Sequence, residues 1–316
     1  MSISYAIIGT GAIGGYYGGR LANSGKEVHF LFHTDYDYVM NNGLRVDSTN
    51  GDFFLPKVNA YNDTKKMPKC DVVLVCMKTI NNHILKNILP SILHEKSLII
   101  LIQNGIGVEE DVEKMIPGVD IAAGLAFICS GKIGPGHIHH QCYGGLTIAP
   151  YNFSNMSIVD KVIEDCIDAG IDAKTAPYHL ARWKKSVWNI PFNGMTVILN
   201  TTTNYLLKDE TESLIKDIML EVINTANIVG TESPIPLSFA DEMISATKVM
   251  IPYSPSMKLD FDFHRPMEIE YLYSRPVATA LQHGTSMPMT SVLEKELRFI
   301  ESQYLQKKIE ARFLYF

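Results

Sequence analysis

The chain has 316 residues, which is enough for two domains of ordinary size with buried cores. Lys and Arg number 28 and Asp and Glu number 34, so the formal net charge of −6 argues against a nucleic-acid-binding surface. The five cysteines are scattered and never form a Cys-x-x-Cys pair, which is typical of reduced thiols in a cytoplasmic protein. No apolar run reaches the length of a membrane span. We expect no signal peptide, because the first predicted strand starts within the first few residues.

The most informative motif follows the first predicted strand. A short apolar run leads into Gly9-x-Gly11-x-x-Gly14, and a helical pattern comes next. Glycines at this spacing allow a tight turn, close approach of a pyrophosphate, and close packing of the helix on the strand. The first helical turn, with Ala12 and Ile13, then offers free N–H groups and a positive dipole end to phosphates. The segment therefore predicts a dinucleotide site of the βαβ type.

The rest of the first half alternates strands and helices. Strands are expected at Val28–Phe32, Leu44–Val46, Phe53–Val58, Asp71–Met77, Ser97–Ile102, Ile121–Cys129 and Ile171–Thr175, with a hairpin over Gly131–Pro150 and helices at Asn82–Leu93 and Ile158–Ala169. The Asn50-Gly51 pair between the third and fourth strands is a strong hairpin-turn signal.

Helical periodicity dominates the second half. Helices are expected at His179–Asn200, Thr211–Val229, Leu237–Thr247, Met267–His283 and Ser291–Ala311. The boundary falls near Ala176-Pro177, because proline favours an extended predecessor and can open a helix. We therefore expect a doubly wound α/β domain of the Rossmann type over residues 1–176, followed by an all-helical domain over residues 177–316.

Two strand ends carry polar residues that suggest chemistry. Lys78 follows one buried strand, and Gln103-Asn104-Gly105 follows the next. In an open parallel sheet, ligands bind outside the carboxyl ends of the strands, so these residues would gather near the glycine loop. Position alone leaves Lys78 equally compatible with an exposed lysine, and Asn104 with a simple turn residue.

The helical half contributes a polar stripe. Lys185, Asn189 and Asn193 are spaced at i, i+4 and i+8, and apolar residues flank them. Burial of such groups is costly unless each finds a partner, and the plain alternative is a solvated face. Further along, Ser256 could bind a carboxylate at a helix start or only cap the helix, and Glu268 could be a first-turn acid.

In this order, the clusters resemble the ketopantoate reductase family over nearly the whole chain. The matching residues are Lys78 and Gln103-Asn104-Gly105, then Trp183, Lys185, Asn189 and Asn193, and finally Ser256, Met257, Asp260, Glu268, Ile269, Glu270 and Tyr271. The resemblance implies reduction of 2-dehydropantoate to pantoate with NADPH, a step in pantothenate and coenzyme A biosynthesis.

The resemblance also implies a role for each site residue. Lys185 would donate a proton to the ketone oxygen and stabilise its charge, while Glu268 would hold the substrate hydroxyl. Asn189, Asn193 and Ser256 would contact substrate. The residues implied at the cofactor are Gly9, Gly11, Ala12, Ile13, Gly14, His33, Lys78 and Asn104.

Three departures from the family pattern stand out. His33 occupies the position where an arginine usually pairs with the 2′-phosphate of NADPH, so NADH stays an alternative cofactor. Pro191 lies inside the Asn189–Asn193 turn, where an interior proline should kink the helix. Leu272-Tyr273-Ser274 replaces a common Ile-Asn-Gly.

Other interpretations stay open. His137 and His139 alternate on one strand, but no acidic or cysteine cluster accompanies them, so no metal site is expected. A related reductase acting on another 2-keto acid would use the same Lys185 and Glu268. A dinucleotide-binding redox sensor would not need that pair. No nucleic-acid or membrane partner is expected, and a homodimer is left open.

Overall fold

The computed structural model describes residues 3–313, and the chain divides into two compact units. The first unit runs to Gln103 and resumes over Val108–Tyr178, and the second unit comprises Asn104–Gly107 and the chain from His179 onward. The sequence places residues 104–107 in the first domain, whereas in the structure this loop clusters with the helical unit. Each unit is described by itself below.

The first unit is built on one ten-stranded sheet. Its strands are β1 Ser4–Ile8, β2 Glu27–Leu31, β3 Leu44–Ser48, β4 Phe53–Leu55, β5 Asn59–Tyr61, β6 Val72–Val75, β7 Leu98–Leu101, β8 Asp120–Gly134, β9 His137–Pro150 and β10 Ala173–Thr175. The order is β4-β3-β9-β8-β7-β6-β1-β2-β5, with β10 paired to β9. Helices α1 Ala12–Asn23, α2 Tyr36–Asn42, α4 Val108–Met115 and α5 Ser157–Asp168 belong to this unit.

The order of the strands confirms the Rossmann-type class and shows where a ligand would bind. Strand β1 pairs in parallel with β2 on one side and with β6 on the other. The chain thus reverses its winding direction at β1, and the crevice beyond the carboxyl end of that strand is the usual ligand site of such sheets. Strands β6 and β7 are buried along their whole length, which explains why they read as continuous apolar runs.

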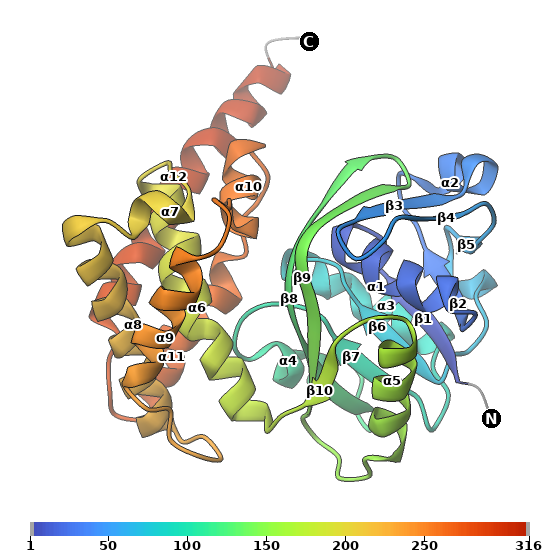
Figure 1. Ribbon diagram of the computed structural model, residues 1–316, viewed down its shortest axis with the longest axis horizontal. Coiled ribbons are helices and arrows are strands. Elements are labelled where there is room, and N and C mark those ends of the chain that lie inside the picture. Colours follow the sequence, from blue (N-terminus) through green and yellow to red (C-terminus); the bar gives the residue numbers. More distant parts are fainter. Residues whose placement is uncertain (1–2, 314–316) are drawn as a thin grey trace. The chain divides into compact units, whose positions relative to one another are not determined.

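The sheet is mixed rather than wholly parallel. Strands β8 and β9 form a long antiparallel hairpin, visible as the curved green ribbon in Figure 1. The turn between them contains Gly136 at φ +57°, a left-handed conformation that favours glycine. Strands β3 and β4 form the expected hairpin around Asn50-Gly51.

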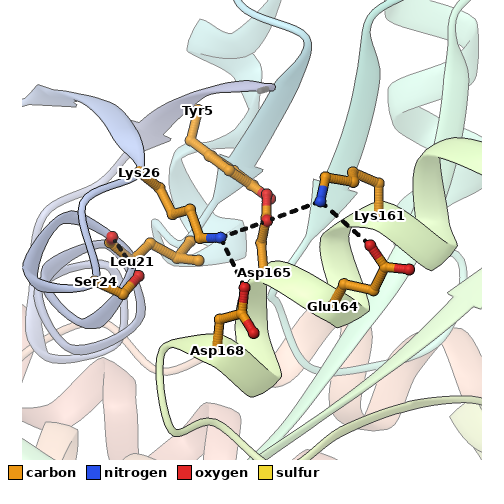
Figure 2. Close-up of polar contacts among 8 residues, drawn as sticks. All are labelled: Tyr5, Leu21, Ser24, Lys26, Lys161, Glu164, Asp165 and Asp168. Atoms are coloured by element: carbon orange, nitrogen blue, oxygen red, sulfur yellow. Dashed lines mark hydrogen bonds and ion pairs between the residues drawn. The ribbon is translucent and has the colours of Figure 1, made fainter. Parts of the chain in front are cut away.

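A cluster of ion pairs around the buried Asp165 ties β1, α5 and the turn before β2 together (Figure 2). The Asp165 carboxylate on α5 accepts hydrogen bonds from the Tyr5 hydroxyl on β1 at 2.8 Å and from Lys26 Nζ at 2.7 Å, and Lys161 Nζ lies 3.5 Å away. Burial alone would raise the pKa of Asp165, but the bonds from Lys26 and Tyr5 outweigh it, so the pKa lies below its usual value. Lys26 also contacts the exposed Asp168 at 3.0 Å.

The second unit is entirely helical, as predicted. Its elements are α6 Tyr178–Ile198, α7 Thr203–Leu206, α8 Asp209–Val229, α9 Ser238–Lys248, α10 Ser256–Asp262, the π-helical turn η4 Glu270–Ser274, α11 Arg275–Gln282 and α12 Pro288–Phe313. Trp183, Phe192, Met219 and Leu297 are among the residues that form one buried core. Among the described residues, no helix combines the length and apolar character that crossing a membrane requires.

Two predicted helices are wrong in detail. The segment expected to be one helix over Asn82–Leu93 consists of short pieces: η2 Thr79–Ile84, α3 Leu85–Ile88 and η3 Leu89–Ser91. Pro90 lacks a backbone N–H, which prevents a regular ladder through this stretch.

The helix expected over Met267–His283 is also different. It opens only after Glu268 and passes through η4 before α11 begins. Pro276 has no backbone N–H, so it cannot donate the regular helix bond to the Leu272 carbonyl. The wider π-turn forms in the stretch where this bond is missing.

Candidate active site

The glycine loop has the geometry that a dinucleotide requires. Gly9 has φ +93°, and a Cβ there would lie 2.5 Å from the Met77 backbone nitrogen. A Cβ on Gly14 would lie 2.4 Å from the Gly9 carbonyl oxygen. A Cβ on Gly11, by contrast, would meet no protein atom within 4 Å. Gly9 and Gly14 are therefore required by packing, whereas Gly11 borders open space, as expected where a pyrophosphate approaches.

The N-terminus of α1 is free to receive an anion. Gly11 is the N-cap and makes no side-chain capping bond, and the first turn contains no acidic residue. The first helical bond runs from Gly15 N–H to the Gly11 carbonyl, so the N–H groups of Ala12, Ile13 and Gly14 have no acceptor within the helix. These residues fit the phosphates of a dinucleotide.

The first acidic residue after the end of β2 is Asp35. His33 is exposed in the loop after β2. The nearby Asp35 is buried, and its carboxylate accepts hydrogen bonds from Lys132 Nζ at 2.8 and 2.9 Å and from Gly136 N–H at 3.1 Å. Burial would raise the pKa of Asp35, but the Lys132 and Gly136 bonds outweigh it, so the pKa is lowered. This carboxylate is therefore committed to the protein itself.

An amide pair holds the loop that carries Lys78. Gln103 Nε2 donates to the Met77 carbonyl at 2.6 Å and to Asn82 Oδ1 at 2.7 Å, and Asn82 Nδ2 returns a bond to Gln103 Oε1 at 3.1 Å. Both amide side chains are buried. The Gln103 of the sequence motif thus positions the residues next to Lys78, which is half-buried at the start of η2.

In the helical unit, Lys185 lies on α6 in a setting that favours its neutral form. Burial lowers the pKa of Lys185 to about 7. The charge of Arg182, one turn earlier on α6 and 2% exposed, acts in the same direction, and the charge of Glu268 opposes it. A lysine with this pKa can give or take a proton near neutral pH.

The loop after β7 reaches the same helix. Asn189 Nδ2 lies 3.5 Å from Asn104 Oδ1, at the long limit of a hydrogen bond. Gly105 has φ +107°, and a Cβ there would lie 2.4 Å from the Tyr271 carbonyl oxygen. The same carbonyl accepts a bond from Ile106 N–H at 2.9 Å. Within this unit the loop is thus fixed between α6 and η4.

Asn193 is held by the protein itself. It is 2% exposed, its Oδ1 accepts from Met257 N–H at 3.1 Å, and its Nδ2 donates to the Asn189 carbonyl at 3.0 Å. The bond to Met257 fixes the first turn of α10, where Ser256 is the first helical residue and Pro255 the N-cap. Ser256 is therefore not the capping residue that the sequence suggested, since α10 shows no side-chain capping bond.

The residues before Glu268 are tightly restrained. Asp260 is buried and accepts a bond from Arg265 Nε at 3.0 Å, and Met267 N–H donates to Glu301 Oε1 at 2.6 Å. Glu268, itself 6% exposed, directly precedes the helical turn over 269–274. The helical unit thus brings together Lys185, Glu268, Asn189, Asn193 and Asn104, whereas the glycine loop, His33 and Lys78 belong to the first unit.

The histidines of β9 have other partners. His137 Nε2 lies 2.8 Å from the Asp47 carboxylate, and His140 bonds to Ser48 at 2.8 Å. In the part of the chain that the structure describes, no group of three or more His, Cys, Asp or Glu side chains could hold a metal ion.

Comparison with known proteins identifies the family. The model described as "Ketopantoate reductase PanE/ApbA" matches residues 5–152, and the model of the C-terminal part of the same family matches residues 178–301. The chain belongs to the ketopantoate reductase family. Lys185, Asn189, Asn193 and Glu268 all lie in the second matched region.

Individual relatives support the same family assignment. The chain is 45% identical over 306 residues to a 2-dehydropantoate 2-reductase of Nostoc, covering 95% of both chains. A crystal structure of 2-dehydropantoate 2-reductase from Geobacter metallireducens matches with a TM-score of 0.91 and 36% identity, covering 94% of this chain and 99% of that one. D-mandelate dehydrogenase in a ternary structure with NADH and anilino(oxo)acetate shares the fold, with a TM-score of 0.85 and 20% identity over 96% and 99% of the two chains.

Sequence reasoning missed two residues near the candidate site. Arg182 escaped notice because basic residues at a helix start are usually exposed. Tyr273 appeared only as a departure from the family pattern, and the sequence alone gives no indication of what its hydroxyl contacts.

Proposed function

We propose that this protein reduces the ketone of 2-dehydropantoate to the hydroxyl of pantoate with NADPH. The observation that carries the proposal is Lys185 on α6, whose pKa is lowered to about 7 and whose charge interacts with that of buried Glu268. A redox sensor without turnover would have no need for such a pair. Membership of a family of oxidoreductases supports the same conclusion.

In this proposal each residue has a defined task. When bound, the reduced nicotinamide supplies the hydride. Lys185 donates a proton to the ketone oxygen as negative charge develops there. Glu268 holds a substrate hydroxyl and favours the protonated form of Lys185, since its charge offsets part of the fall in the pKa of that lysine. Asn189 and Ser256 bind substrate. The second N–H of the Asn193 amide, which the bond to Asn189 leaves over, donates one hydrogen bond to substrate.

The choice of NADPH rests on the residues after β2. An enzyme that prefers NADH usually offers a carboxylate to the ribose 2′-hydroxyl. The nearby Asp35 carboxylate is committed to Lys132 and Gly136 instead. We propose that His33 and Lys78 face the 2′-phosphate and the neighbouring ribose, and that Asn104 contacts the nicotinamide end.

The decisive experiment is steady-state reduction of 2-dehydropantoate by the purified protein with NADPH and NADH side by side. We expect turnover with a higher kcat/KM for NADPH. Lys185→Ala should lower kcat by about 10²–10⁴-fold while leaving the Kd for NADPH within about threefold, because the lost group acts as a general acid. Unchanged turnover in this variant would refute the mechanism.

A reductase of another 2-keto acid is the second candidate. The bonds of Asn193 to Met257 and Asn189 favour it, because they leave this amide little capacity for the hydroxyl end of 2-dehydropantoate. A panel of 2-keto acids decides between the two. A higher kcat/KM for a substrate without a hydroxyl would replace our first choice.

The cellular location and the oligomeric state of the protein are also proposals. All five cysteines are free thiols, which supports a cytoplasmic location. We also propose that the chain forms a homodimer, and analytical ultracentrifugation of the purified protein would measure its mass in solution.

A further inference from the structure

The hydroxyl of Tyr273 is built into the hydrogen-bond ladder of α6. It donates to the Ile190 carbonyl at 2.8 Å and accepts from the Gly194 backbone N–H. Residues 190 and 194 are the pair that a regular α-helix joins directly, from the carbonyl of residue i to the N–H of residue i+4. The hydroxyl therefore bridges two groups of the helix backbone, and Tyr273 is fully buried while it does so.

The helix lacks one of its regular hydrogen bonds at the bridged turn. Pro191 lies inside it and cannot donate to the Val187 carbonyl, and its ring crowds that carbonyl. Side-chain groups that enter the i to i+4 ladder are a recognised cause of helix bending. The Tyr273 hydroxyl thus stabilises a turn that proline has already opened.

Gly194 makes this contact sterically possible. A Cβ on Gly194 would lie 2.9 Å from the Tyr273 hydroxyl oxygen, but 3.4 Å or more from any other side-chain atom. The conflict would therefore be with the hydroxyl in particular. Tyr273, one departure from the family pattern, thus packs against the turn that contains Pro191, another departure.

The turn also carries the polar stripe of the candidate site. Asn189 directly precedes it and Asn193 lies within it, and Asn193 holds the first turn of α10 through Met257. Tyr273 belongs to η4, which follows Glu268, and its neighbour Tyr271 holds the loop of Asn104 through Ile106. One hydroxyl therefore connects the element that carries Lys185 to the segment that carries Glu268.

We propose that Tyr273 is a positioning residue, whose hydroxyl sets the separation between the proline-bent turn of α6 and the Glu268 segment and so fixes the substrate-binding amides. This inference rests on the proposed function. It assigns Tyr273 no contact with substrate or cofactor. The effect of losing the hydroxyl should therefore fall on substrate binding, and the cofactor should bind as before.

The test compares Tyr273→Phe with Tyr304→Phe. Tyr304 is a matched control, because its hydroxyl also donates a single backbone bond, to the Arg265 carbonyl at 2.8 Å, away from α6. Tyr273→Phe should raise the KM for 2-dehydropantoate about five- to tenfold and change kcat less than about threefold, with the Kd for NADPH unchanged. Tyr304→Phe should lower the melting temperature similarly and leave the KM alone. Equal KM values in the two variants would overturn the proposal.

Gly194→Ala provides an independent variant. It should reproduce the rise in KM by displacing the hydroxyl, and combining it with Tyr273→Phe should add little, because the alanine methyl then has room. Additive effects would contradict the model.

Hydrogen exchange of the backbone amides in residues 188–198 supplies a readout that needs no substrate. We expect faster exchange in Tyr273→Phe than in the wild type or in Tyr304→Phe. If the wild-type protein does not reduce 2-dehydropantoate, the proposed function fails, while exchange still tests the bridge. Unchanged exchange would overturn the bridge whatever the substrate.

Discussion

At the scale of single residues, the protonation of Lys185 should govern the pH dependence. Proton donation requires the ammonium form, and its fraction falls as pH rises through the pKa of about 7. We therefore expect kcat/KM for reduction to be level at lower pH and to fall by about tenfold per pH unit well above the pKa. Oxidation of pantoate needs the neutral amine, so its kcat/KM should rise over the same range.

Glu268 supplies the control for this assignment. Its charge raises the pKa of Lys185, so Glu268→Gln should move the midpoint of the reductive profile to lower pH. A pH profile of kcat/KM without a break near neutral pH, or a midpoint that moves upward in the variant, would exclude Lys185 as the titrating donor.

The glycine loop offers a matched pair of substitutions. Gly11→Ala adds a methyl group that meets no protein atom, so the free energy of unfolding should change by less than about 1 kcal/mol. The same methyl should weaken NADPH binding by about tenfold or more, because it occupies the approach of the pyrophosphate. Gly9→Ala should instead destabilise the fold by about 1–3 kcal/mol, since φ is +93° and Met77 is in contact. Calorimetry and cofactor titration separate the two effects.

At the scale of elements, hydrophobic periodicity and turn residues were enough to predict most of the strands and helices. The buried strands, the hairpin at Asn50-Gly51 and the long α6 all follow from local patterns. The π-turn after Glu268 did not, because a proline that breaks one bond of the ladder does not by itself show which wider turn will replace it. The hydrogen-bond partners of Asn193 could not be predicted either, because the sequence does not show whether its amide will bind a ligand or a backbone group of the protein.

The Asp165 cluster should make the first unit sensitive to acid. The folded-state pKa of Asp165 is lowered, so its contribution to stability is complete above the unfolded-state pKa and is lost as pH falls through the folded-state value. Asp165→Asn should cost about 3 kcal/mol at neutral pH, because it removes the charged partner of Lys26 from a buried site.

The matched control for this prediction is Asp168→Asn. The Asp168 side chain is 63% exposed, so its contact with Lys26 should contribute less than about 1 kcal/mol. Denaturant unfolding at several pH values measures both variants. If the Asp165→Asn loss stayed constant down to strongly acidic pH, the carboxylate would not be the responsible group.

At the scale of the whole molecule, cofactor binding should appear as thermal stabilisation. A ligand at 100 times its Kd stabilises the state that binds it by about 2.7 kcal/mol, which corresponds to about 4 °C in a protein of this size. We expect NADPH to raise the melting temperature more than NADH at equal concentration, and Gly11→Ala to reduce the shift. An equal or larger shift with NADH would contradict the assignment of cofactor.

The placement of residues 104–107 has a practical consequence for protein engineering. The helical unit is assembled from two stretches of chain, and Gly105 and Ile106 pack against the Tyr271 backbone with no room for a Cβ at Gly105. A chimera that joins the first unit of this chain to a relative's helical unit with a single crossover would therefore mix parents within one packed unit. Recombination should succeed only when the four-residue loop is inherited together with the helices that it contacts.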